Sequence, residues 1–219
     1  MIAWSAATAL AVAALLFSEY TGRSTGVWVA KPLASTAFVA VALGAGALES
    51  PYGGAILAGL VLSWFGDVLL IPRGRPRIFL AGVVSFLAGH VAYAGAFLLR
   101  GVDAAVFAVA ALAAGLLAVA VLRWLGAHVP ADMKLAVPAY VAVISIMVVC
   151  ATASFAAHGN AWIPVGAVGF YLSDLSVARD RFVVSEFVNR LWGLPLYYAA
   201  QVALAWSVYA ERSIVGGFG

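Results

Sequence analysis

The sequence predicts an all-α fold: a polytopic membrane helix bundle of about eight transmembrane helices, in a single integral membrane domain over residues 1–219. Two observations predict it. Hydrophobic residues make up 65% of the chain and charged residues 10%, whereas soluble domains average about 25% charged residues. The apolar residues also gather in stretches long enough to cross a bilayer, since a spanning helix needs roughly 20 mostly apolar residues.

Eight stretches meet this length requirement. The first follows an N-terminus without basic residues, because the first basic residue, Arg23, comes after the apolar segment. A secretory signal peptide begins with a basic region, so we expect this stretch to be a retained span. The expected spans are roughly 2–18, 31–48, 53–71, 78–99, 103–122, 133–155, 161–178 and 191–210.

Glycine and proline mark the breaks between these spans. Lys31-Pro32 opens the second span, where a proline suits the first turn of a helix. The fifth span is rich in Ala, Val and Leu, so we expect it to be a structural scaffold helix. Pro195 bends or starts the eighth. The other breaks are Ser50-Pro51, Pro72 to Pro76, Gly126 to Pro130, and Gly159-Asn160.

Lysine and arginine are concentrated in alternate loops, which predicts the orientation of the chain. Ten of the twelve lie in or beside the first, third, fifth and seventh loops, and only Arg100 and Arg212 lie on the opposite side. Cytoplasmic loops carry the excess of basic residues. We therefore expect odd loops in the cytoplasm and both termini outside. In a bacterium this places the protein in the inner membrane.

Several classes of function find no support. The single cysteine, Cys150, lies in an apolar run, so no intrachain disulfide forms. The basic residues that give the net charge of +3 are spread over many loops, which is not a nucleic-acid footprint. No His/Cys cluster has zinc spacing. We expect no cofactor and no metal.

Two aspartates, Asp67 and Asp174, lie inside apolar stretches. The other seven acidic residues fall at or near the ends of such stretches. A carboxylate at membrane depth costs several kcal/mol, so it usually faces a protein interior or a wet cavity and is functional. Each aspartate lies about four residues before the cytoplasmic end of an odd-numbered span, which is about 6 Å at 1.5 Å per residue. The shared depth suggests two halves of one site.

Other polar residues lie at membrane depth and are candidates for the same site. His90 lies roughly 18 Å from the cytoplasmic end of the fourth span, deeper than the aspartates, so contact with them requires tilt or a cavity. It is either a buried imidazole bonded to one neighbour or a residue that orients a carboxylate or water. Tyr197 and Tyr198 each share a helix face with Gln201, as interhelical hydrogen-bond partners or as site residues.

Lys31, at the cytoplasmic start of the second span, is either a membrane anchor or a contact for a phosphate or headgroup. The polar segment from Arg179 to Arg190 is either a short amphipathic helix on the membrane surface or a solvated connector.

The positions of these residues repeat weakly along the chain. Asp67 precedes His90 and Tyr93 by 23 and 26 residues, and Asp174 precedes Tyr197 and Gln201 by 23 and 27. Each half of the chain thus offers an aspartate helix followed by a polar helix. Halves of four spans would be parallel rather than inverted repeats.

Two nearby carboxylates in a low-dielectric site do not both ionise, so they share one proton near neutral pH. Such a pair supplies a general acid and a general base together. Both would lie near one leaflet, where the polar head and first carbons of a lipid are found. The acid-labile bonds there include the vinyl ether of plasmalogens, whose hydrolysis requires protonation at the β-carbon.

Five short patterns carry a resemblance to a known family: KPL at 31–33, GDVLL at 66–70, FLAGHVAY at 86–93, GAVGFYLSD at 166–174 and YYAAQ at 197–201. In this order and spacing, over about 170 residues, the chain resembles the YhhN-like lysoplasmalogenases. No single pattern is specific, but their combination is.

The resemblance implies an eight-span membrane hydrolase that cleaves the vinyl ether bond of lysoplasmalogen, releasing a fatty aldehyde and a glycerophospho-headgroup. It implies that Asp67 and Asp174 are the catalytic pair. It also implies that one pocket is lined by substrate-binding residues, namely Lys31, His90, Tyr93, Tyr197, Tyr198 and Gln201. Residues 1–30 and 100–132 add little to the resemblance, so we assign nothing there.

Two other functions compete with this one. Paired aspartates on two helices are also typical of intramembrane aspartyl proteases, but Phe65-Gly66 before Asp67 does not fit their GxGD motif and no PAL-like turn follows Asp174. A small proton-coupled transporter would use the aspartates as proton carriers, but inverted repeats are lacking. A purely structural role would make the aspartates interhelical hydrogen-bond partners.

Overall fold

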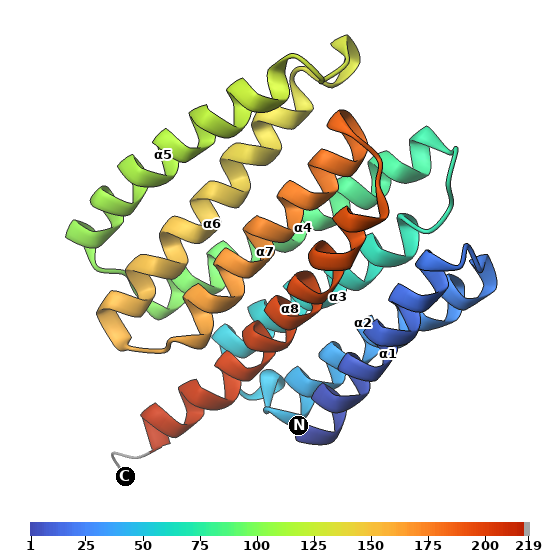
Figure 1. The fold of residues 1–219 in the computed structure, drawn as a ribbon. Helices are drawn as coiled ribbons and strands as arrows, with labels where there is room; N and C mark the ends of the chain where they lie inside the picture. The colour runs from blue at the N-terminus through green and yellow to red at the C-terminus, as the bar shows by residue number, and fades with distance from the viewer. Residues whose placement is uncertain (217–219) are drawn as a thin grey trace.

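A computed structural model describes residues 1–216, with side chains to residue 211, and its long elements are eight α-helices (Figure 1). The fold class predicted from the sequence is confirmed. The helices are α1 Ile2–Tyr20, α2 Ser24–Gly44, α3 Pro51–Leu69, α4 Pro76–Arg100, α5 Ala104–Gly126, α6 Ala136–His158, α7 Trp162–Ala178 and α8 Phe187–Gly216. Two short 3-10 turns, Ala47–Glu49 and Ala131–Met133, and a π-helical turn, Arg179–Val183, lie between them.

Local sequence explains where several helices begin and end. The Ser50 hydroxyl accepts a hydrogen bond from the Gly53 N–H at 3.0 Å, and Pro51 occupies the first turn of α3. The Asp103 carboxylate caps α5 by accepting from the Val106 N–H at 2.8 Å. Gly159 follows α6 with a φ of +78°, a conformation that favours glycine. These caps fix the breaks that the sequence marks.

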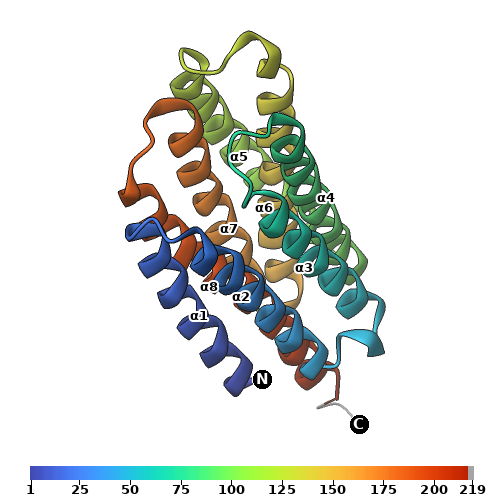
Figure 2. The same cartoon turned by 90° about the vertical axis from the view of Figure 1, so that its right-hand side faces the viewer.

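Six helices form a closed ring in the order α2, α3, α4, α6, α7 and α8. Helix α1 packs outside α2 and α8, and α5 packs outside α6 (Figures 1 and 2). The most extensive contacts are between α3 and α4 and between α7 and α8, which are the two helix pairs that carry the aspartates and the candidate polar residues. The ring encloses the candidate site.

By length and composition, six of the described helices could cross a membrane, namely α1 to α6. Helix α5 is the clearest case, because it has the highest mean hydropathy of the six and few buried side chains. Its outward side chains Val109, Leu112 and Leu116 are exposed and apolar, as expected of a surface that faces lipid. The sequence-based interpretation of this span as scaffold agrees with its position outside the ring.

The second span begins earlier than predicted, and the prediction that Lys31 and Pro32 open it is wrong. Helix α2 starts at Ser24, so Lys31 lies about two turns inside it and Pro32 is an interior proline. Residues 24–30 form the additional turns before Lys31. The prediction took the charge of Lys31 as the end of the apolar span, but the Asp67 carboxylate neutralises this lysine inside the bundle.

The two termini lie at the same end of the bundle (Figure 1). The loops that carry most of the basic residues lie at the opposite end, because successive helices alternate in direction. This arrangement agrees with an even number of spans. Which end faces the cytoplasm stays a prediction from the loop charges.

Candidate active site

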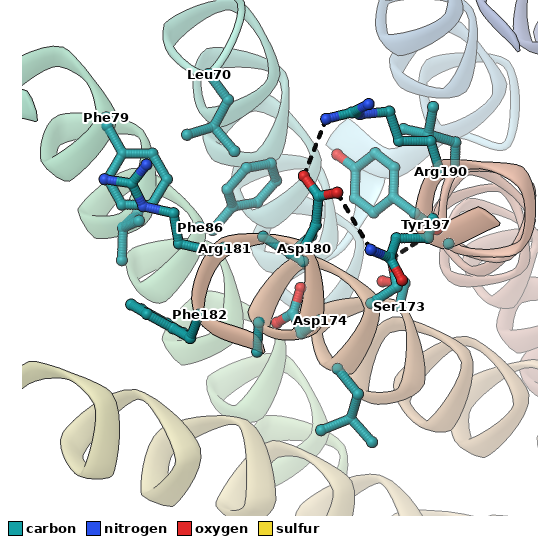
Figure 3. A pocket seen from close by; sticks show the side chains of 18 of the residues that line it. Leu70, Phe79, Phe86, Ser173, Asp174, Asp180, Arg181, Phe182, Arg190 and Tyr197 are labelled. Carbon is teal, nitrogen blue, oxygen red and sulfur yellow. Dashed lines mark hydrogen bonds and ion pairs between the residues drawn. The ribbon is translucent and has the colours of Figure 1, made fainter. Parts of the chain in front are cut away.

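A cavity of about 670 Å³ opens inside the ring at the end with the basic loops (Figure 3). Both Asp67, from α3, and Asp174, from α7, line it. The mouth is polar, whereas the wall formed by α4, α5 and α6 is apolar. The mouth is formed by Glu19, Arg73, Arg75, Asp180, Arg181 and Arg190, and the apolar wall by Val83, Phe86, Val121, Leu125, Val137, Val141 and Ile144.

Asp67 is buried and receives three donors. Its Oδ1 lies 3.3 Å from the Lys31 Nζ. Its Oδ2 accepts hydrogen bonds from the Ser35 hydroxyl at 2.6 Å and from the Tyr197 hydroxyl at 2.7 Å. An ionised carboxylate has only acceptor sites, so this set of an ammonium and two hydroxyls is matched to a carboxylate anion.

Asp174 has a different set of partners. The Tyr140 hydroxyl donates to its Oδ2 at 2.9 Å, and the His90 Nε2 lies 3.4 Å from the same oxygen. No lysine or arginine among the described residues is paired with this carboxylate. The two aspartates therefore share a cavity but not an environment.

The ring of His90 is fixed in one tautomer by its neighbours. The His90 Nδ1 lies 2.7 Å from the Phe86 carbonyl oxygen, which can only accept, so Nδ1 carries a hydrogen. The ring is fully buried and stacks on Phe170 with centroids 4.2 Å apart. Nε2, which has no other polar partner in the described chain, faces the Asp174 carboxylate. With a neutral imidazole and an ionised carboxylate, the His90 Nε2 and the Asp174 Oδ2 would be two acceptors facing each other. One proton on either atom removes this conflict.

His90 contacts Asp174 although it lies farther from the end of its own helix than Asp174 does from the end of α7. The π-helical turn after α7 carries the helical path on to Val183, so Asp174 lies nine residues from its end rather than four. His90 lies fourteen residues after the start of α4 at Pro76. The helix ends do not share a plane, so counting residues from each end overstates the difference in depth.

The remaining candidate residues fall into two groups. Lys31 and Tyr197 line the cavity. Tyr93 and Gln201 lie behind it, where the Tyr93 hydroxyl donates to the Gln201 Oε1 at 2.5 Å. The Tyr198 hydroxyl lies 3.3 Å from the Ser35 Oγ, which in turn donates to Asp67. None of these three side chains lines the cavity, and of the three only Tyr198 contacts a partner of Asp67.

Sequence reasoning missed two residues that bind the aspartates, Ser35 and Tyr140. Tyr140 lies in an apolar segment of α6, where an isolated tyrosine needs a hydrogen-bond partner. That signal was available in the sequence. Ser35 gave no such signal, because serine is common in membrane helices and bonds its own backbone, as Ser35 also does with the Lys31 carbonyl at 3.0 Å.

The two halves of the chain exchange partners across the site. Asp67, from the first half, binds Tyr197 of the second, and Asp174, from the second half, contacts His90 of the first. The weak sequence repeat pairs each aspartate with the polar helix that follows it, and α3–α4 and α7–α8 do pack together. One polar contact of each aspartate nevertheless runs between the halves.

The segment after α7 closes one side of the mouth. It forms the π-helical turn Arg179–Val183 and then an extended stretch to α8. Asp180 anchors it by accepting from the Arg190 guanidinium at 3.0 Å and from the Asn189 amide at 3.2 Å (Figure 3). The segment is part of the cavity wall.

Among the described side chains, no three His, Cys, Asp or Glu residues converge as metal ligands would.

Comparisons with known proteins point to one family. A sequence profile described as the YhhN family matches residues 26–208. A protein of Mycobacterium tuberculosis named lysoplasmalogenase is 30% identical over 90% of this chain and 76% of its own length. The lysoplasmalogenase TMEM86A of Bos taurus is 30% identical over 77% of this chain and 70% of its own, and the human protein of that name 29% over the same shares. No solved structure is significantly similar.

Proposed function

The chain belongs to the YhhN family, and we propose that it hydrolyses the vinyl ether bond of a lysoplasmalogen with Asp67 and Asp174 as its acid–base pair. That it is an ether-bond hydrolase rests on the curated relatives named lysoplasmalogenase. The roles of the residues rest on the site. The observation that carries them is that both aspartates line one cavity and have different partners.

Asp174 and His90 hold the proton that the reaction needs. Because the His90 Nδ1 donates to the Phe86 carbonyl, the Nε2 and the Asp174 Oδ2, 3.4 Å apart, face each other as a pair that carries one proton. Asp174 is also on the cavity wall, within reach of a substrate, whereas His90 is not. Asp174 is therefore the general acid, and His90 shares its proton.

Asp67 has the complementary role. The Lys31 ammonium and two hydroxyls favour its anionic form. An anion in the cavity stabilises a cation formed beside it and accepts a proton from water. Asp67 is therefore the residue that stabilises the oxocarbenium ion and activates water.

The reaction proceeds in three balanced steps. The acid transfers a proton to the β-carbon of the C=C bond, whose electrons form the new C–H bond and leave an oxocarbenium ion. Water adds to the α-carbon as Asp67 takes its proton, which gives a hemiacetal. The bond between this carbon and the glycerol oxygen then breaks. The glycerol oxygen takes the proton that Asp67 holds, and the hemiacetal hydroxyl gives its proton back to Asp174, so that a fatty aldehyde and the glycerophospho-headgroup leave and both carboxyl groups are restored.

The polarity of the cavity orients the lipid. The protein is an integral membrane protein, and the apolar wall formed by α4, α5 and α6 suits the alkenyl chain. The polar mouth suits the headgroup. Because the mouth lies at the end with the basic loops, the substrate comes from the cytoplasmic leaflet, and in a bacterium from that leaflet of the inner membrane.

Purified protein in detergent, given a lysoplasmalogen, tests the proposal through the release of aldehyde. We expect Asp67→Asn and Asp174→Asn each to lower kcat by about 10²–10⁴-fold, the usual contribution of general acid–base catalysis. Undiminished release by either variant would contradict the two-carboxylate mechanism. A well-folded wild type that releases no aldehyde would instead favour proton-coupled transport.

A saturated alkyl ether and an acyl ester with the same headgroup are the substrate controls. Neither can form an oxocarbenium ion by protonation of a C=C bond, so we expect no cleavage of either. Cleavage of either one would mean that vinyl ether chemistry is not what the site selects.

A further inference from the structure

Two arginines at the mouth of the cavity have no carboxylate partner among the described side chains. Arg73 donates to Glu19 at 2.7 Å, and Arg190 lies 3.0 Å from Asp180, so these two are neutralised. Arg75 and Arg181 line the same mouth and take part in none of the ion pairs. The mouth therefore carries two unneutralised guanidinium groups.

Arg181, from the turn after α7, reaches the start of α4, where Arg75 also lies. The Arg181 guanidinium lies over the ring of Phe79, 4.4 Å from its centroid (Figure 3). Phe79 is one turn after Arg75, since its N–H donates to the Arg75 carbonyl at 3.0 Å. Stacking holds the face of a guanidinium and leaves its N–H edges free to bind an oxyanion.

The same turn lacks negative charge. Arg75 is the N-cap of α4, a helix of 25 residues with no acidic residue in its first turn. The N-terminus of a long helix adds a partial positive charge to that of the two side chains. An anion is the ligand that this arrangement fits.

The carboxylates of the cavity, by contrast, are all engaged. Glu19 and Asp180 bind the arginines named above, and Asp67 and Asp174 bind their own partners. No carboxylate on the described cavity wall is left for a cationic amine. The charges of the mouth thus favour a phosphate over a cationic amine.

We propose that Arg75 and Arg181 form a phosphate site at the first turn of α4, which holds the phosphodiester of a lysophospholipid and selects the phosphate rather than the amine. The inference rests on the proposed function, because the apolar wall and the aspartates place the alkenyl chain inside the cavity and the headgroup at its mouth. Choline and ethanolamine lipids are then accepted about equally.

The kinetic test uses three substrates in mixed micelles: lysoplasmenylcholine, lysoplasmenylethanolamine and a 1-alkenylglycerol without phosphate. We expect Arg75→Gln and Arg181→Gln each to raise KM for both phospholipids by about tenfold, the effect of losing one hydrogen bond to a charged group. The KM for the alkenylglycerol and all kcat values should not change. Arg181→Lys should recover only part of the loss, since lysine lacks the planar stacked group.

Arg77→Gln and Arg123→Gln are the matched controls. Both arginines are exposed and lie at the same end of the bundle, but neither lines this cavity. An equal rise in KM from either control would reduce the effect to general surface charge and overturn the proposal. A more than tenfold preference for one of the two headgroups would overturn it too.

A binding measurement separates this proposal from the proposed function. The probe is the saturated alkyl lysophosphocholine, titrated calorimetrically into wild type and variants in detergent. Binding that weakens about tenfold in Arg75→Gln and Arg181→Gln supports the site even if the wild type cleaves no vinyl ether. If the wild type hydrolyses the vinyl ether but the arginine variants bind the probe as tightly as the wild type does, the phosphate site is overturned and the proposed function stands. Competition by inorganic phosphate as strong as by glycerophosphocholine would mean a free-anion site and also overturn it.

Discussion

Asp67 and Asp174 have the same side chain but different neighbours, and this difference is the basis of the opposite roles that we propose for them. A lysine and two hydroxyls surround the first, and a histidine with one free lone pair faces the second. The resemblance placed Lys31, His90 and Tyr197 in one pocket with the aspartates, but it did not say which aspartate each residue contacts. Ser35 and Tyr140 were missed. What the sequence did predict is that the two carboxylates lie at membrane depth.

The ion pair between Lys31 and Asp67 gives a prediction about stability. Lys31→Met leaves a buried carboxylate without its cation, which should destabilise the protein by about 3–5 kcal/mol, as for other broken buried pairs. Adding Asp67→Asn removes the orphaned charge, so the double variant should regain most of that stability and still lack activity. Thermal unfolding in detergent measures both, and a double variant less stable than Lys31→Met would contradict the role of the pair.

Protonation of the β-carbon, the step in which we propose Asp174 as the donor, can be followed by isotope. In D₂O the acid carries deuterium, so the aldehyde should contain one deuterium on the carbon next to its carbonyl. Mass spectrometry of the product measures it. The control is the same aldehyde incubated in D₂O with Asp174→Asn protein, and product without deuterium would exclude protonation of the β-carbon.

At the scale of elements, α3 and α4 approach each other closely beside the site. A Cβ added to Gly66 would lie 2.6 Å from the ring of Phe86, so glycine is required where the two helices meet. Gly66 precedes Asp67, and Phe86 provides the carbonyl that fixes His90. The packing of this helix pair therefore controls the position of Asp67 and of His90, which faces Asp174.

We expect Gly66→Ala to destabilise the protein by about 1–3 kcal/mol, as overpacking does, and to lower kcat because Asp67 moves. Gly54→Ala is the matched control on the same helix, since nothing lies within 4 Å of its added Cβ. The control should be neutral or slightly stabilising. Equal loss of activity in both variants would mean that helix propensity, and not the contact with Phe86, explains the result.

The sequence predicted the number and order of the helices better than their ends. Length, apolar composition and Gly-Pro breaks identify eight segments, because each helix must satisfy its own backbone in lipid. The start of α2 and the π-helical extension of α7 escaped prediction. Both depend on tertiary contacts, one on the neutralisation of Lys31 by Asp67 and the other on the bonds that anchor Asp180.

At the scale of the whole molecule, charge and shape agree on a direction. The cavity opens at the end that carries most of the basic residues, and both termini lie at the other end. The positive-inside rule then predicts that the mouth lies in the cytoplasmic leaflet.

In a bacterial host, a fluorescent reporter that matures only in the cytoplasm should stay dark when fused after residue 219. A phosphatase that is active only in the periplasm should be active at the same position. Fusions in the loop at Gly74 should give the reverse pattern. A fluorescent C-terminal fusion would show that the orientation is wrong and would move the substrate to the other leaflet.

The exchange of partners between halves has a consequence for biogenesis. Lys31, Asp67 and His90 are synthesised early, but the hydroxyl of Tyr197 that completes the surroundings of Asp67 arrives only with the last helix. During insertion the early helices carry an incompletely partnered carboxylate in the membrane. The hydrolase therefore acquires its site only when the chain is almost finished, and a fragment that ends before α8 has both aspartates without a complete active site.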